Sequence, residues 1–350
     1  MCRAFASPRK YAILPYMSIL ISILTVLFLA SCGGTGSGPL KAVGSGVIYG
    51  DGELADNRSE ASIDEVLKNN NIHYHEAKML LEFSRSTAGM VEIGKHVISF
   101  TDGSVMAKRP LRTFKAVREL CDGERFERQR SLPVCTGFLV APDLMVTAGH
   151  CVNKINYHNK AWIFGYDHTR AHESLPSFKR EYVYHTKEVL EWEEDKVIRR
   201  DFALVRLDRA VTVAKPLKFR KYGEASVGTQ LAIIGHPNGL PTKISADAEI
   251  LENTVNAYKT NLDSFGGNSG SPVFNLYTGE IEGILISGAT DFLPNFESDP
   301  LCNKVNRKRD YQGAEYVAKI SMVDIEKYLV NDDFLTSEFA FGESDFFWRF

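Results

Sequence analysis

The chain has 350 residues, of which 44% are hydrophobic and 24% are charged. This balance is typical of a globular protein that can bury a sizeable core, and the length leaves room for one large domain or two small ones. The net charge of −3 argues against nucleic acid as the main partner, because phosphate binding needs a basic face.

The N-terminal segment has the composition of an export signal. Basic residues at positions 3, 9 and 10 precede an apolar run that ends in the letters LASC at Cys32. A basic start, an apolar centre and small residues at the end are typical of a secretory signal, predicted here over 1–31. LASC resembles a bacterial lipobox, in which cleavage leaves Cys32 carrying lipid. The alternative is an uncleaved transmembrane anchor, since about 20 apolar residues span a bilayer.

Both alternatives export everything after residue 32. We expect an envelope protein held to the membrane through its N-terminal lipid, or a secreted protein if the chain is processed. Gly33 stands where an aspartate is typical of inner-membrane retention, which favours the outer membrane. The glycine-rich stretch 32–46 has the composition of a flexible tether.

Export also decides how the cysteines are interpreted. Of the six in the sequence, Cys2 is lost with the signal and Cys32 is predicted to carry lipid. Outside the cytoplasm, disulfides are favoured over zinc ligands. Four cysteines allow three pairings, and the residues concerned are Cys121, Cys135, Cys151 and Cys302.

Few elements are predicted before residue 135. The stretch 62–71 starts as a helix at Ser62, and 96–100 has the pattern of a short strand. His73 and His75 alternate as two residues on one face of a strand would, so a metal pair is an alternative there, although no third ligand stands nearby. We expect His236 to shape a loop.

From residue 135 onward the sequence is dominated by short β-type runs separated by Gly, Pro, Asn and Asp. This pattern predicts an all-β sandwich or barrel. The runs are 136–141, 144–148, 161–166, 202–207, 230–235, 270–274 and 281–286. The pattern of 322–330 predicts one late helix. The tail 332–350 is rich in aromatic and acidic residues, and either packs on the domain as a strap or serves as an interaction segment.

Three residues in these runs suggest nucleophilic catalysis. Ser269 lies in the glycine-rich sequence DSFGGNSGSPVF, and a serine hydroxyl is a poor nucleophile until an oriented base removes its proton. His150 ends the apolar run LMVTAGH and supplies an imidazole. Asp201 begins the run DFALVRL, where a buried carboxylate needs a partner. Individually, a core histidine, a strand-entry cap and a turn serine are the alternatives.

The order of these residues, with their flanking sequences, resembles that of the chymotrypsin-like serine peptidases. The segments CTGFLVAPDLMVTAGHC, DFALVRL and GGNSGSPVF are similar to the three signature segments of the family. The bacterial branch that includes the glutamyl endopeptidases is the most similar. The resemblance covers about 135–330.

This resemblance implies an all-β fold of two packed six-stranded antiparallel barrels with a C-terminal helix. The expected domain spans 47–331, with the first barrel at about 47–210, the second at about 223–318 and the helix at about 321–331. His150 and Asp201 then lie in the first barrel and Ser269 in the second. The active site forms in the cleft between the barrels.

The roles of these residues follow from the same resemblance. His150 takes the proton of Ser269 and returns it to the leaving amine, while Asp201 holds the imidazole tautomer. The oxyanion hole maps to the backbone N–H groups of Gly267 and Ser269. A side chain at Gly267 would restrict the backbone conformation that aims its N–H inward.

The resemblance also suggests the residues that bind substrate. Asp263, followed by Ser264, has the spacing of the aspartate at the floor of the trypsin-like specificity pocket, which predicts cleavage after Arg or Lys. The alternative is a turn cap or a solvent-facing carboxylate. The strand expected to line the pocket comprises Leu285, Ile286, Ser287 and Gly288.

Two positions depart from related peptidases. Asn268 replaces the aspartate that pairs with the freed N-terminus in chymotrypsin, so that ion-pair switch is absent in the same form. Leu285 stands where the glutamyl endopeptidases place a histidine, which argues against glutamate specificity.

The resemblance implies one disulfide between Cys135 and Cys151, the bridge of the histidine loop. This leaves Cys121 and Cys302 for the second.

The sequence therefore predicts an exported serine endopeptidase that acts on protein or peptide substrates as a monomer, without metal or organic cofactor. Residues 33–134 contain no clear removable propeptide, since GVIYGDGELADNR resembles the start of a mature domain. The alternative function is a catalytically silent surface binding lipoprotein of the same fold.

Overall fold

A computed structural model describes residues 43–44, 48–51 and 58–329. The predicted signal peptide, the lipid on Cys32, most of the tether and the C-terminal tail lie outside these residues. Among the described residues, no helix is both long and apolar enough to cross a membrane.

The first barrel is a closed antiparallel sheet of six strands in the order β11-β12-β8-β7-β4-β9. Its strands are β4 (Thr87–Glu92), β7 (Cys135–Ala141), β8 (Leu144–Thr147), β9 (Lys160–Ile163), β11 (Val183–Asp195) and β12 (Arg200–Leu207). β7, β8 and β9 are buried along their whole length, which agrees with their largely apolar sequences.

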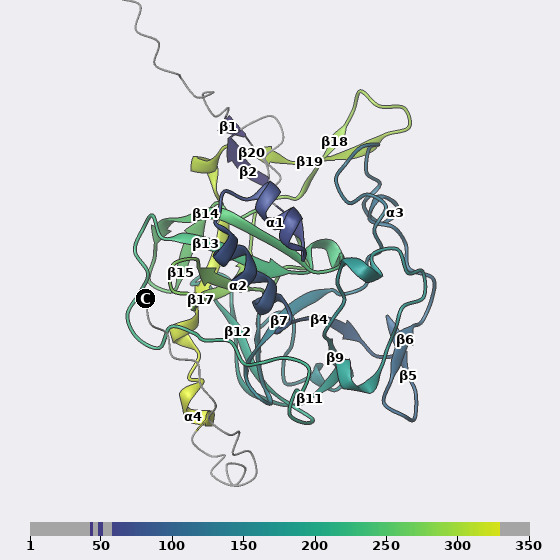
Figure 1. Ribbon diagram of the computed structural model, residues 1–350, viewed down its shortest axis with the longest axis vertical. Coiled ribbons are helices and arrows are strands. Elements are labelled where there is room, and N and C mark those ends of the chain that lie inside the picture. Colours follow the sequence, from purple (N-terminus) through teal and green to yellow (C-terminus); the bar gives the residue numbers. More distant parts are fainter. Residues whose placement is uncertain (1–42, 45–47, 52–57, 330–350) are drawn as a thin grey trace, which may run out of the picture. The chain divides into compact units, whose positions relative to one another are not determined.

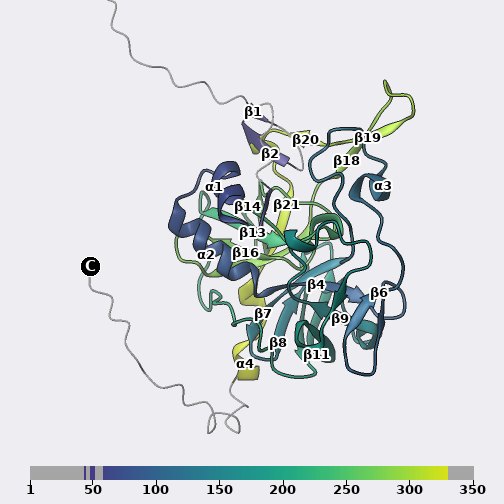
Figure 2. The same cartoon turned by 45° about the vertical axis from the view of Figure 1, so that its right-hand side comes forward.

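The second barrel also has six strands, in the order β13-β16-β17-β21-β15-β14, and closes through the pairing of β13 with β14. Its strands are β13 (Gln230–Gly235), β14 (Lys243–Asn253), β15 (Ala257–Thr260), β16 (Pro272–Asn275), β17 (Ile281–Ser287) and β21 (Glu315–Lys319). The predicted architecture of two six-stranded antiparallel barrels is thus confirmed. Figures 1 and 2 show both barrels.

Two helices lie beside the second barrel. They are α1 (Ile63–Asn69), at the position predicted, and α2 (Tyr74–Ser84), which no pattern in the sequence predicts. Strand β3 (Ser59–Glu60), which precedes α1, pairs with β14. From α2, whose place beside the second barrel is seen in Figure 2, the ring of Phe83 stacks on Phe274 of β16 with centroids 5.0 Å apart. His73 caps the start of α2, so the interpretation of His73 and His75 as a pair on a strand is wrong.

Smaller elements surround the barrels. They are β1 (Val43–Gly44), β2 (Ile48–Asp51), β5 (Val97–Ser99), β6 (Val105–Ala107), β10 (Ser177–Phe178), β18 (Phe292–Asn295), β19 (Cys302–Val305), β20 (Arg307–Lys308), α3 (Phe114–Arg118) and α4 (Glu326–Leu329). α4 is the predicted C-terminal helix, but it has only four residues and follows a 3₁₀ turn at Ile320–Met322. The residues of the helical pattern are therefore divided between two short turns.

One hydrophobic cluster joins the two barrels. It contains Phe138 and Leu204 of the first barrel, Ile234 and Phe274 of the second, and Leu80 of α2, all of them fully buried. Burial of this size is the main stabilising contribution in a fold of this kind. The cluster holds the facing ends of the barrel strands, and therefore the site between them, in one rigid unit.

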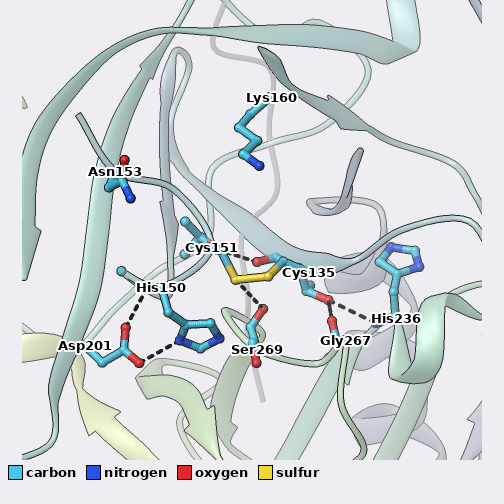
Figure 3. Close-up of a disulfide and its surroundings, with 12 residues drawn as sticks. Cys135, His150, Cys151, Asn153, Lys160, Asp201, His236, Gly267 and Ser269 are labelled. Carbon is cyan, nitrogen blue, oxygen red and sulfur yellow. Dashed lines mark hydrogen bonds and ion pairs between the residues drawn. A yellow bond between two sulfur atoms is a disulfide. The ribbon is translucent and has the colours of Figure 1, made fainter. Parts of the chain in front are cut away.

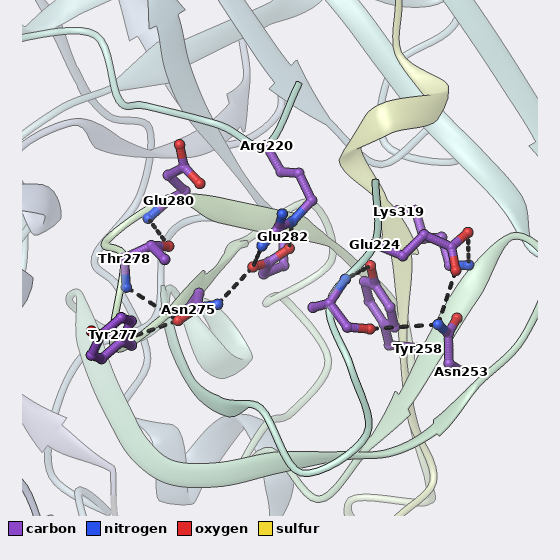
Figure 4. A network of polar contacts seen from close by, with 11 residues as sticks. Arg220, Glu224, Asn253, Tyr258, Asn275, Tyr277, Thr278, Glu280, Glu282 and Lys319 are labelled. Carbon is purple, nitrogen blue, oxygen red and sulfur yellow. Dashed lines mark hydrogen bonds and ion pairs between the residues drawn. The ribbon is translucent and has the colours of Figure 1, made fainter. Parts of the chain in front are cut away.

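A polar network ties the chain between the barrels to the second barrel (Figure 4). Arg220 lies in the link between β12 and β13, and its guanidinium pairs with Glu282 of β17 through Nη2–Oε1 at 2.7 Å and a second contact from Nε. Asn275 Nδ2 donates to Glu282 Oε1 at 2.8 Å. The Glu282 carboxylate is fully buried, so these donors replace the water it loses.

Candidate active site

The first barrel supplies a hydrogen-bonded histidine and aspartate. β8 pairs with β12 so that Ala203 lies opposite Thr147. The chain just after β8 therefore passes beside the first residues of β12, which include Asp201. His150, three residues after the end of β8, is brought to Asp201 by this register.

Asp201 accepts two hydrogen bonds from His150. Its Oδ1 accepts from the backbone N–H at 2.9 Å, and its Oδ2 lies 2.7 Å from the ring atom Nδ1. Asp201 is only 3% exposed. An ionised carboxylate only accepts, so Nδ1 carries the hydrogen and Nε2 is left as a base. Figure 3 shows the imidazole between Asp201 and Ser269.

Ser269 lies in the turn that leads into β16 of the second barrel. Among the described residues its side chain forms no hydrogen bond, and none joins it to His150. Such bonds are often long in unliganded enzymes and shorten when substrate binds. The backbone of the turn is held across the barrels, because Thr136 N–H donates to the Ser269 carbonyl at 2.9 Å and Thr136 Oγ1 donates to the Gly267 carbonyl at 2.9 Å.

In this turn, the backbone N–H groups of Gly267 and Ser269 have no acceptor among the described residues. Their neighbours are all satisfied: Gly266 donates to Asp291 at 2.8 Å, and Asn268, Gly270 and Ser271 each donate to a backbone carbonyl. Most backbone N–H groups in folded proteins have a partner. Two free donors, one of them the N–H of the serine itself, could together bind an oxygen that carries developing negative charge.

Glycine is needed at two positions of this turn. Gly267 has φ +98° and Gly270 has φ +87°, a region that other residues rarely adopt. A Cβ on Gly267 would lie 2.7 Å from the carbonyl oxygen of His236, and one on Gly270 would lie 2.1 Å from that of Thr136. The glycines therefore serve both the conformation and the close approach of neighbouring backbone.

Both predicted disulfides are present in the structure. Cys135 is bonded to Cys151, with sixteen residues of separation, and Cys121 to Cys302. The sulfurs of Cys135 and Cys151 and a ring nitrogen of His150 lie within 4.8 Å of one another. Because both sulfurs are in the disulfide, they are not available as the thiolates that a metal ion would need. The bridge fixes the segment that carries His150 beside the start of β7 (Figure 3).

Three of the residues predicted to bind substrate lie beside the turn of Ser269 or beside His150. Leu285, near the end of β17, accepts from Gly270 N–H at 2.7 Å and donates to the Ser271 carbonyl at 3.0 Å. Ile286 and Ser287, the next residues, share a cavity with His150. Gly288 follows the strand.

Asp263 and Ser264 are buried, at 2% and 0% exposure. The alternative that Asp263 points to solvent is therefore wrong. Ser264 Oγ accepts from Asn268 Nδ2 at 3.4 Å.

Two carboxylates near the turn were not found by sequence reasoning. Asp291 accepts from Gly266 N–H, and its burial raises its pKa above the ordinary value. Glu315 of β21 is 1% exposed and lies against Gly288, where an added Cβ would meet its Oε2 at 1.9 Å. Neither lies within a motif of the sequence, so no local signal marks them.

His236 lies in the loop after β13, as the sequence analysis expected, and is 1% exposed. Its Nδ1 lies 3.0 Å from the Leu240 carbonyl, and its Nε2 has no partner among the described residues. Burial lowers its pKa to about 4. Asn238 N–H, in the same loop, donates to the Gly266 carbonyl, so this loop supports the turn that carries Ser269.

Comparison with protein families gives a match over the part of the chain that holds all three candidate catalytic residues. The trypsin-like peptidase domain family matches residues 135–284. His150, Asp201 and Ser269 all lie within this peptidase-domain match. A comparison with curated protein sequences finds no match.

Among solved structures, human heparin binding protein is similar over 71% of this chain and 93% of its own, with 14% identity and a TM-score of 0.45. The active form of the Rv3671c protease from M. tuberculosis is similar over 86% of this chain and 93% of its own, with 14% identity and a TM-score of 0.42. A serine endoprotease from Yersinia pestis is similar over 75% of this chain and 68% of its own, with 12% identity and a TM-score of 0.44.

Proposed function

We propose that this chain is a serine endopeptidase that hydrolyses peptide bonds through an acyl-enzyme on Ser269. The observation that carries the proposal is the pair of free N–H groups of Gly267 and Ser269 beside a histidine hydrogen-bonded to a buried aspartate. These are the parts that acyl transfer needs: a nucleophile, an oriented base and donors for the oxyanion.

In the proposed reaction, His150 Nε2 takes the proton of the Ser269 hydroxyl as Oγ attacks the substrate carbonyl. The oxyanion is held by the N–H groups of Gly267 and Ser269. His150 then gives the proton to the leaving amine, and Asp201 stabilises the imidazolium between the two transfers. Water attacks the acyl-enzyme by the same route and frees Ser269.

A fluorophosphonate probe tests this proposal, because it reacts with an activated serine. We expect the mature wild-type protein to be labelled and Ser269→Ala to be unlabelled, with peptide hydrolysis reduced by about 10⁴-fold or more. Ser271→Ala is the matched control, since its buried hydroxyl has no hydrogen-bond partner in the part of the chain that the structure describes, and it should still be labelled. A folded, mature wild-type protein that is not labelled would favour the silent binding-protein function.

We further propose cleavage after Arg or Lys. Asp263 is a buried carboxylate six residues before Ser269, and negative charge there would stabilise a basic substrate side chain. The test is a peptide-library cleavage profile of wild type and Asp263→Ser. Cleavage after Arg or Lys that is lost in the variant supports the proposal, and cleavage after Glu or an apolar residue, unchanged in the variant, overturns it.

Export and anchoring through lipid on Cys32 are part of the same proposal and are supported by the N-terminal sequence alone. We expect a monomer at the outer membrane that cleaves proteins or peptides, with activity that persists in a chelator. Cys32→Ala should leave the membrane fraction or stay unprocessed. A palmitate analogue that does not label the wild type would contradict lipidation.

A further inference from the structure

A cavity of about 250 Å³ lies directly beside His150, between the two barrels. One wall is formed by the hairpin that joins β11 to β12, and the other by the end of β17. Its lining residues are His150, Lys196, Arg199, Asp201, Ile286 and Ser287. A substrate held for attack by Ser269 would place a side chain in this space, because the cavity shares His150 with the reacting centre.

The charge left over in the cavity is positive. Both oxygens of Asp201 already accept hydrogen bonds from His150, and its single negative charge is outnumbered by the two cations that line the cavity, Lys196 and Arg199. Lys196 Nζ is 3.7 Å from Glu194 Oε1, and its side chain is 78% exposed. Arg199 forms no ion pair with any described residue.

The other acidic residues of the hairpin are occupied elsewhere. Glu193 pairs with Arg200, with Nη2 at 2.7 Å from Oε1. Asp195 Oδ1 accepts from the N–H groups of Val197 at 2.9 Å and Ile198 at 3.2 Å, and so closes the turn. Within the described hairpin, no carboxylate is therefore paired with Arg199.

Arg199 is held in position by the second barrel. Its backbone has φ +60°, a conformation that costs a non-glycine residue on the order of 1 kcal/mol or more. Its guanidinium lies over the ring of Tyr316 on β21, 3.1 Å from the centroid, and Asn256 Nδ2 donates to the neighbouring Ile198 carbonyl at 2.8 Å. A cation held in this way loses little side-chain freedom when it binds an anion.

We propose that Arg199, assisted by Lys196, forms a subsite that binds an acidic side chain of the substrate close to the scissile bond. A guanidinium presents two parallel N–H donors that match the two oxygens of a carboxylate. The inference rests on the proposed function in one respect: a peptide occupies the cleft beside His150. The subsite would require an acidic side chain in the substrate, in addition to the residue after which the substrate is cut.

The test measures binding, so it does not depend on turnover. Binding of labelled peptides to the Ser269→Ala protein is measured by fluorescence anisotropy. Each peptide contains one Arg, and Glu, Gln or Lys is placed in turn at each of the three positions on either side of it. At one position we expect Glu to bind about tenfold more tightly than Gln, equivalent to about 1.4 kcal/mol. The preference should weaken with added salt.

Variants then identify the residue responsible. Each substitution is made in the Ser269→Ala protein. Arg199→Gln should abolish the preference for Glu, and Arg199→Lys should retain part of it. Arg199→Glu should replace it with a preference for Lys. Lys196→Gln should reduce it less than Arg199→Gln. Arg200→Gln is the matched control, because it removes a neighbouring cation that does not line the cavity and already has Glu193 as its partner.

Failure of this inference and failure of the proposed function give different results. Equal binding of Glu and Gln peptides at every position, no binding at all, or a preference that survives Arg199→Gln would overturn the subsite. Wild-type protein that is not labelled by a fluorophosphonate, combined with a preference for Glu that depends on Arg199, would overturn the peptidase function alone. The thermal stability of each variant separates a local loss from unfolding.

Discussion

The two barrels contribute to the candidate site in different ways. The first barrel contributes side chains, since His150 and Asp201 follow or begin strands and hydrogen-bond to each other. The second contributes the Ser269 hydroxyl and, beside it, backbone donors, since the N–H groups of Gly267 and Ser269 are exposed by a turn with positive φ at Gly267 and Gly270. The three side chains should fail when their chemistry is changed, whereas the backbone donors should fail when a Cβ is added to a glycine of the turn.

The barrels also differ in how their ion pairs are buried. Arg220 and the fully buried Glu282 form a pair in the second barrel (Figure 4). Arg200 and Glu193 form a pair of the same geometry in the first barrel, where both side chains are about a third exposed, at 34% and 39%. A buried charge that loses its partner cannot turn to water, whereas an exposed one can. The same pair of residue types should therefore matter much more in the second barrel.

The largest expected effect concerns the side-chain half of the site. Asp201→Asn should lower kcat by about 10⁴-fold, because an amide N–H₂ facing Nδ1 favours the wrong imidazole tautomer. The measurement is steady-state hydrolysis of a peptide that the wild type cleaves. Activity within tenfold of wild type would show that the pair of His150 and Asp201 does not act as proposed.

The comparison of ion pairs gives the next effect. Arg220→Ala should lower the free energy of unfolding by about 3–5 kcal/mol, because it leaves the Glu282 carboxylate buried without its cation. Arg200→Ala, the matched change in the first barrel, should cost about 1 kcal/mol or less. Urea denaturation at neutral pH measures both. Equal losses would mean that burial does not distinguish the two pairs.

The backbone half of the site is tested with glycines. Gly270→Ala should cost about 2–4 kcal/mol, since positive φ and the close Thr136 carbonyl and Thr147 hydroxyl both oppose a Cβ. Gly223 also has positive φ, at +72°, but nothing lies within 4 Å of its Cβ position. Gly223→Ala should therefore cost only about 1 kcal/mol. A Gly270→Ala protein as stable as Gly223→Ala would contradict the tight packing of this turn.

The smallest effect is a dependence of stability on pH from His236. Its pKa is about 4 in the folded protein against 6.5 as the ordinary value. Between these values the unfolded chain binds more protons than the folded one, so the free energy of unfolding falls as the pH falls. The loss from pH 7 to pH 5 should be about 2 kcal/mol.

His236→Gln should flatten this slope between about pH 7 and 5 and leave the slope above pH 7 unchanged. Stability curves in urea across this range measure it. A slope that is the same in both proteins would assign the pH dependence to other groups.

The sequence alone was sufficient to predict many of the buried strands, although β4 and β21 are buried as well and were missed. β7, β8, β9, β13 and β16 are apolar runs bounded by turn residues, and such runs carry a strong local signal. β11 and β14 were missed because they alternate buried with charged residues, as in EVLEWEED and ADAEILEN, and these letters equally suit a helix. Helix α2 was missed because its start at His73 has no ordinary capping residue.

The sequence also located the three candidate catalytic residues, because each lies in a local motif: His150 after an apolar strand, Asp201 at the start of another, and Ser269 among glycines. Only the tertiary structure placed Arg199 against Tyr316, Glu315 against Gly288 and Asp291 beside Gly266. Each of these contacts joins segments that are far apart in the chain, and no spacing within one segment encodes it. Closure of the barrels and packing of one against the other decide which distant residues meet, and therefore decide what surrounds the nucleophile.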